Sequence, residues 1–140
     1  MSLYLDGSIL VKLLAFEPES ERVAKIIQSE TKHIVSSLAR LEALVVLGTL
    51  VAAGEISKRT AGQRKTRLQD LLALPSFAFE RVRSEVFEIA EEQLAPAYCA
   101  TLDRLHLAAM HSLGLRRLFT NDDQQTRAAR ALGYEVIMPR

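Results

Sequence analysis

Hydrophobic and polar residues follow two different periods along the chain, and together these predict short strands separated by helices. Residues 2–5 form an apolar run that ends at Asp6, and Gly7 and Ser8 then predict a tight turn into an apolar helix over 9–15. The same patterns predict further strands at 33–35, 77–79, 117–120 and 134–138, and helices at 21–30, 38–53, 56–74, 85–94, 98–113 and 124–132. We therefore predict one α/β domain over residues 1–140, with three α/β/α layers and a central, mostly parallel sheet of about five strands.

Composition excludes several other classes of protein. With 140 residues, 49% of them hydrophobic, and a net charge of +1, the chain is typical of a globular domain rather than a disordered or polybasic one. Its single cysteine, Cys99, excludes an internal disulfide and a cysteine cluster for zinc. The longest uncharged stretch, 43–54, is shorter than the roughly 20 residues that a membrane span needs. We expect a cytoplasmic protein with no membrane partner.

Two acids stand at predicted strand ends. Asp6 directly follows the first strand, and Asp122 lies just after the strand at 117–120. In an open parallel sheet, ligands bind beyond the carboxyl ends of the strands, where helix N-termini and loops converge. Both carboxylates are therefore expected to face one crevice.

Two further acids lie on predicted helices beside apolar neighbours. Helical spacing places Glu42 with Ala39 and Val45, and it surrounds Asp103 in the same way with apolar residues. A carboxylate on a buried face is costly unless it is paired or binds a cation. Taken singly, each acid has a structural explanation: Asp6 and Asp122 act as caps, and Glu42 and Asp103 lie at the edge of their apolar stripes or pair with Arg40 and Arg104. Taken together, four acids predict an oxygen-rich pocket of the kind that binds Mg²⁺ or Mn²⁺.

Four segments carry a family resemblance that runs over nearly the whole chain in the same order and spacing. They are Tyr4–Leu13, Val35–Glu42, Leu102–Ala109 and Leu118–Asp122, the last followed by Ala128, Ala129 and Gly133. In these segments the sequence resembles the PIN-domain family, and most of all the VapC toxins of bacterial and archaeal toxin–antitoxin pairs. The resemblance implies a PIN-like fold and a Mg²⁺- or Mn²⁺-dependent endoribonuclease.

The resemblance also implies which residues form the site. It places Asp6, Glu42, Asp103 and Asp122 as the catalytic, metal-binding quartet, with Ser8 and Thr120 as the polar residues that accompany them. Asp123 is an additional acid that substitutes for or assists Asp122, which is preferred for its spacing from Thr120. Gly7 departs from the family pattern, where a threonine is common, and is expected to affect the loop more than the ligands.

Partners follow from the same resemblance: RNA as substrate, a cognate antitoxin whose arginine reaches the carboxylates, and a second copy of the chain in a homodimer. Two basic clusters are candidates for phosphate contacts or are simply solvated helix faces. One lies on the predicted helix 56–74, which we expect to project from the domain, and the other lies near the Asp122 loop. Their members are Lys58, Arg59, Arg64, Lys65 and Arg67 in the first, and Arg116, Arg117, Arg127 and Arg130 in the second.

Other chemistries fit the sequence less well. His106 and His111 do not share a helix face with one another, so they form no two-histidine metal pair, and we expect His106 to have a structural or supporting role. No nucleophile elbow and no glycine-rich phosphate loop is present. The alternatives are a non-catalytic PIN-like module that binds RNA or protein, and a metal-dependent phosphatase with Asp6 at its site.

Overall fold

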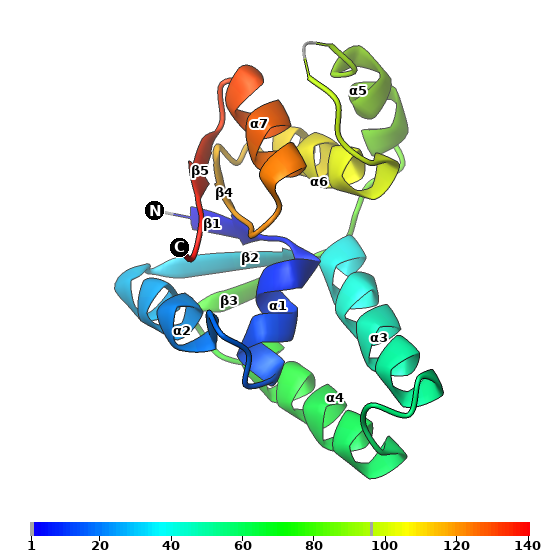
Figure 1. The fold of residues 1–140 in the computed structure, drawn as a ribbon. Coiled ribbons are helices and arrows are strands. Elements are labelled where there is room, and N and C mark those ends of the chain that lie inside the picture. The colour runs from blue at the N-terminus through cyan, green and yellow to red at the C-terminus, as the bar shows by residue number, and fades with distance from the viewer. Residues whose placement is uncertain (1, 96) are drawn as a thin grey trace.

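A five-stranded sheet forms the centre of the computed structural model, which describes residues 2–95 and 97–140 (Figure 1). The strands lie in the order β3-β2-β1-β4-β5, and every neighbouring pair is parallel. The predicted sheet is therefore confirmed, and it is parallel throughout the described strands. Their bounds are β1 Ser2–Leu5, β2 Lys32–Ser36, β3 Phe77–Glu80, β4 Arg117–Phe119 and β5 Glu135–Ile137.

Helices cover both faces of the sheet, as the predicted three layers require. Figure 1 shows α1 to α4 on one face and α5 to α7 on the other, and α3 and α4 extend together beyond the sheet. The predicted projection of the helix after residue 56 is thus confirmed. The helices are α1 Gly7–Leu14, α2 Ser20–Ser29, α3 Ser37–Ala52, α4 Lys58–Leu72, α5 Val86–Glu92, α6 Thr101–Ser112 and α7 Asp123–Ala131.

The central strand β1 divides the core into two halves. Successive side chains of a strand point to opposite faces, so Leu3 and Leu5 enter the cluster beneath α1 to α4, whereas Tyr4 enters the cluster beneath α5 to α7. All three side chains are fully buried. A strand that is apolar on both faces is what a sheet covered on both sides demands. Tyr4 also carries a hydroxyl into its half of the core, and that hydroxyl has two partners described below.

Two predicted boundaries are wrong. Gly7 and Ser8 are not a tight turn but the first residues of α1, because Asp6 caps this helix directly. The helix predicted from residue 98 begins only at Thr101. Arg104 gives the reason for this later start, since its guanidinium donates to the main-chain carbonyls of Gln93 and Ala97 and holds the preceding segment as a loop.

Over residues 2–95 and 97–140, no helix combines the length and the apolar character needed to cross a bilayer. Cys99 is a buried free thiol.

Candidate active site

The chain order changes direction at the centre of the sheet, and the acids gather there. From β1 the chain builds outward through β2 to β3, and then returns to the other side of β1 with β4 and β5. A crevice at the carboxyl ends of β1 and β4 follows from this reversal. Asp6 is the residue after β1, and Thr120 is the residue after β4.

Asp6 is buried and held by hydrogen bonds to both carboxylate oxygens. Its Oδ1 accepts from the Ser8 hydroxyl at 2.5 Å and from the backbone N–H groups of Ser8 and Ile9, which are those at the start of α1. Its Oδ2 accepts from the Thr120 hydroxyl at 2.6 Å. Burial raises the pKa of Asp6, and the hydrogen bonds from Ser8 and Thr120 oppose that shift. The carboxylate is therefore fixed in one orientation.

Thr120 joins this carboxylate to the next one. Its hydroxyl oxygen accepts from the backbone N–H of Asp122 at 3.1 Å while its proton is donated to Asp6. The Asp122 side chain in turn accepts from the backbone N–H of Gln125 at 2.6 Å, which caps α7. Asp6 and Asp122 are thus both helix caps, as the structural explanation requires, and they also lie at the same edge of the sheet.

Glu42 lies at the border of the buried face of α3 rather than in its centre. The buried side chains of this helix include Ala39, Ala43 and Leu47. Val45, by contrast, is 57% exposed, so the prediction that it lies on a buried face together with Glu42 is wrong. The Glu42 side chain keeps 22% of its exposure and its Oε1 contacts His106 Nε2.

Neither arginine neighbour pairs with the helical acids in the way the structural explanation proposes. Arg40 lies over the Phe79 ring, 4.3 Å from its centroid. Arg104 turns to the main-chain carbonyls that precede α6. Among the described residues, the Asp103 carboxylate has no hydrogen-bond partner. Pairing with an arginine therefore explains neither acid, whereas the position of Glu42 at the border of the buried face agrees with the other structural explanation.

The acids act on one another strongly enough to change a protonation equilibrium. Burial raises the pKa of Asp103 to about 6, and the negative charges of Asp122, Asp6 and Glu42 add to the shift. The structure thus brings together the four acids that the sequence singled out, from β1, α3, α6 and the start of α7. A cluster of carboxylates with a strongly raised pKa is typical of a functional site.

Gly7 lies against Glu42, contrary to the expectation that it affects mainly the loop. A Cβ atom built on Gly7 would lie 2.5 Å from the Cβ of Glu42 and 2.8 Å from its Oε1. Real side chains do not tolerate such distances, so glycine lets the start of α1 lie directly against Glu42. The family's common threonine does not fit this arrangement of the two helices.

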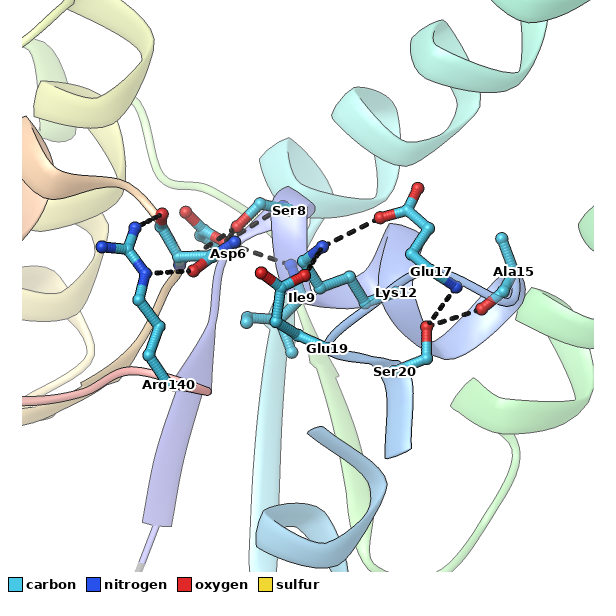
Figure 2. A network of polar contacts seen from close by, with 10 residues as sticks. Asp6, Ser8, Ile9, Lys12, Ala15, Glu17, Glu19, Ser20 and Arg140 are labelled. Carbon is cyan, nitrogen blue, oxygen red and sulfur yellow. Dashed lines mark hydrogen bonds and ion pairs between the residues drawn. The ribbon is translucent and has the colours of Figure 1, made fainter. Parts of the chain in front are cut away.

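Asp123 lies at the outer side of the cluster. Its Oδ1 pairs with Arg140 at 2.9 Å, and both side chains are about half exposed or more. The negative charge of Asp122, by contrast, helps to raise the pKa of Asp103. Figure 2 shows Arg140 on one side of Asp6 and Ser8, with Lys12 on the other. The arrangement favours Asp122 over Asp123 as a member of the quartet.

The predicted basic cluster near the Asp122 loop is wrong for two of its members. Arg117 opens β4, so it lies at the opposite end of the sheet, where it pairs with Glu30 at 2.7 Å. Arg116 also precedes β4 and donates to the Gly133 carbonyl. Arg127 and Arg130 are exposed on α7. Arg116 and Arg117 are near Asp122 in the sequence, but β4 lies between them and Asp122 and carries the chain from one end of the sheet to the other.

The four acids have the chemistry that a hard divalent cation requires of its ligands. All four groups offer carboxylate oxygens, which Mg²⁺ and Mn²⁺ prefer. As the side chains stand, no three His, Cys, Asp or Glu residues within 2–95 and 97–140 are arranged to hold a metal ion.

The parallel sheet with its reversal at β1, together with four acids at the carboxyl edge, defines the class of protein. The sequence profile of the PIN domain matches residues 3–131. This chain belongs to the PIN-domain family, which confirms the resemblance seen in the sequence.

Individual relatives narrow the comparison within that family. Ribonuclease VapC46 of Mycobacterium tuberculosis is 39% identical over 140 residues, which cover 99% of this chain and 98% of that protein. The structure of VapC20 from Mycobacterium tuberculosis, a toxin that cleaves the sarcin–ricin loop, superposes with a TM-score of 0.70 at 16% identity, covering 90% of this chain and 94% of that one. DNA-bound VapBC from Salmonella typhimurium gives a TM-score of 0.72 at 13% identity, covering 100% and 99%. The two structural likenesses show the fold alone.

Proposed function

We propose that this protein is a metal-dependent endoribonuclease that acts as the toxin of a toxin–antitoxin pair. The observation that carries the proposal is the gathering of Asp6, Glu42, Asp103 and Asp122 at the carboxyl edge of β1 and β4, where the pKa of Asp103 is raised to about 6. Full-length similarity to a ribonuclease of the VapC type supports it.

The quartet would hold one or two Mg²⁺ or Mn²⁺ ions. A bound ion of this kind lowers the pKa of a coordinated water and stabilises charge on the attacking and leaving oxygens of a phosphodiester. Asp6 supplies a carboxylate whose orientation is already fixed by Ser8 and Thr120. Asp103 supplies one with no competing hydrogen bond among the described residues, and it carries the negative charge that attracts the cation.

The remaining acids have distinct duties in this proposal. Asp122 adds a carboxylate from the start of α7, tied to the same threonine as Asp6. Glu42 has one oxygen against His106 and no partner among the described residues for the other, so that Oε2 is available as a ligand or as the base that orients a water. No side-chain nucleophile is needed.

The proposed partners are RNA, a cognate antitoxin and a second copy of the chain. A VapBC complex with the same fold supports the antitoxin. The chemistry of the edge also supports it, because a planar guanidinium binds carboxylates bidentately and would occupy the place of a cation. Arg127 is exposed on α7, whose first residue follows Asp122 at this edge, and is the proposed phosphate contact, whereas Arg130 lies in the last turn of α7, toward the other end of the sheet.

The test is RNA cleavage by the full chain with Mn²⁺ or Mg²⁺, with and without EDTA, beside an Asp6→Asn variant. We expect cleavage that needs the ion and is lost in the variant. Glu88→Gln removes the same charge from an exposed acid on α5 and serves as the matched control, with cleavage unchanged. Cleavage that survives EDTA would overturn the proposal. Binding of RNA without cleavage would favour the non-catalytic module, and release of phosphate from small phosphomonoesters would favour the phosphatase.

A further inference from the structure

A buried histidine lies directly behind the candidate site. His106 is completely buried, and both of its ring nitrogens have partners. Its Nε2 contacts Glu42 Oε1, and its Nδ1 lies 2.6 Å from the hydroxyl of Tyr4. The three side chains come from α3, β1 and α6, so the histidine connects the centre of the sheet with one acid of the quartet.

The hydrogen bonds extend beyond Tyr4 and set a direction. The Tyr4 hydroxyl lies 2.8 Å from Ser36 Oγ, and that oxygen accepts from the backbone N–H of Ala39 at the start of α3. Burial raises the pKa of Tyr4, so its hydroxyl keeps its proton. If Ser36 donates to Tyr4 and Tyr4 donates to His106 Nδ1, both hydroxyl protons in this series of hydrogen bonds have an acceptor.

This direction selects one form of the imidazole. An ionised Glu42 only accepts hydrogen bonds, so His106 Nε2 donates to it, and Nδ1 accepts from Tyr4. A protonated ring would also donate from Nδ1, and the Ser36 hydroxyl would then have no acceptor among its hydrogen-bond partners, Tyr4 and Ala39. The hydrogen bonds of the buried network therefore favour a ring in which Nε2 donates to Glu42 and Nδ1 accepts from Tyr4.

Gly7 bounds the same carboxylate from another element. The backbone of α1 at this residue leaves no room for a Cβ beside Glu42. The backbone at Gly7 thus restricts the position of the Glu42 side chain, and His106 contacts its Oε1. Its Oε2 has no hydrogen-bond partner among the described residues.

We propose that His106 is a positioning residue for Glu42. In its Nε2–H form, fixed by Tyr4 and Ser36, it holds Oε1 so that Oε2 is presented to a divalent cation or to the water at the acidic edge. Gly7 supports the same orientation by letting α1 close against Glu42. This inference rests on the proposed function, since it assigns a role within that same site.

The first test is Mn²⁺ affinity of the full chain, measured by isothermal titration calorimetry. His106→Leu keeps the apolar volume but loses the donor, and we expect a loss of affinity of about tenfold or more. In His106→Gln the amide N–H can still donate to Glu42, and we expect it to recover most of that loss. His33→Gln removes another buried imidazole, whose Nε2 bonds the Ile27 carbonyl, and should leave Mn²⁺ affinity unchanged.

The second test is a direct reading of the imidazole by nitrogen-15 NMR of histidine-labelled protein. We expect the His106 signals of a ring that carries its proton at Nε2 and accepts a hydrogen bond at Nδ1, and we expect Tyr4→Phe to perturb the Nδ1 signal. A ring protonated at Nδ1 would overturn the proposed direction of the network and with it the inference.

A third variant tests the other side of the carboxylate. Gly7→Ala should lower Mn²⁺ affinity because it displaces Glu42, whereas Gly48→Ala, on the same helix as Glu42, has open space around its Cβ and should not. If the wild type binds Mn²⁺ and His106→Leu binds it equally well, the inference fails alone. If the wild type binds no Mn²⁺, the proposed function fails and the inference falls with it.

Discussion

The two ends of the sheet contain charged groups in opposite arrangements. At the amino end, Arg117 lies 2.7 Å from Glu30 and 3.6 Å from Glu135, so a cation stands between two acids. At the carboxyl end, none of the acids Asp6, Glu42, Asp103 and Asp122 pairs with a lysine or an arginine among the described residues, and the Asp103 carboxylate has no hydrogen-bond partner among them. The same parallel strands carry both arrangements.

The protonation equilibria follow this difference. The hydrogen bonds from Arg117 lower the pKa of Glu30, whereas burial and neighbouring carboxylates raise the pKa of Asp103 to about 6. The first end is arranged to stabilise the folded chain. The second end lowers the stability of the folded chain because its carboxylates are buried and lie near one another, and perturbed pKa values of this kind cluster at functional sites.

The largest effect is expected when an acid is removed from the carboxyl end of the sheet. Asp122→Asn should lower metal-dependent RNA cleavage by at least about a hundredfold, since a lost ligand costs no less than a lost supporting contact. Asp123→Asn changes the adjacent residue, which pairs with Arg140, and should lower cleavage by less than about threefold, the size of a surface effect. Initial rates on one RNA measure both. Equal losses of cleavage in the two variants would contradict the assignment of Asp122, rather than Asp123, as the fourth acid of the site.

The amino end responds to mutation through stability instead. Arg117→Met leaves Glu30 without its partner in a setting where both side chains are mostly buried, and we expect a loss of about 2 kcal/mol in the free energy of unfolding. Urea denaturation measures it. Mn²⁺ affinity of the folded variant should stay at the wild-type value, and a fall in that affinity would show that the two ends are not separate.

The smallest effect concerns pH. The pKa of Asp103 is about 6 in the folded chain against an ordinary value of 3.8, so between these values the folded state holds a proton that the unfolded state has lost. Stability in EDTA should therefore rise as the pH falls from about 7.5 to about 5, by about 1 kcal/mol once solvent screening is allowed for. Glu30 has the opposite effect on stability, and at lower pH. Its pKa is lowered in the folded chain, so the stability that it contributes is lost as the pH falls below its ordinary pKa of 4.5.

Asp103→Asn is the control for this pH effect. The amide does not titrate, so the variant should show a smaller rise in its urea midpoint between the same two pH values. It should also be more stable than the wild type near neutral pH in EDTA. An identical pH dependence in the two proteins would show that Asp103 is not the group that titrates.

The periodicity of the sequence was enough to predict the layers, the order of elements and the acids at strand ends. Asp6 and Asp122 could be placed because parallel strands bring their carboxyl ends to one edge. Glu42 and Asp103 stood out because acids beside apolar neighbours require a partner. These arguments use local spacing together with one general property of parallel sheets.

The remaining features depend on contacts between distant segments. The contact of His106 with Glu42 spans 64 positions, and the fit of Gly7 against Glu42 depends on how closely two helices approach. Arg117 was misplaced because nearness in sequence to Asp122 hides the length of the strand between them. The late start of α6 follows from carbonyls that Arg104 reaches only in the folded chain.

The hydrogen bond from Thr120 to Asp6 joins residues 114 positions apart, and β4 pairs directly with β1. Closing so large a loop is slow compared with forming local helices. On a ribosome that releases the N-terminus first, strands β1 to β3 can pair early, but the acidic edge waits for β4 and the start of α7. A nascent chain therefore carries no complete acidic site until most of it has been synthesised.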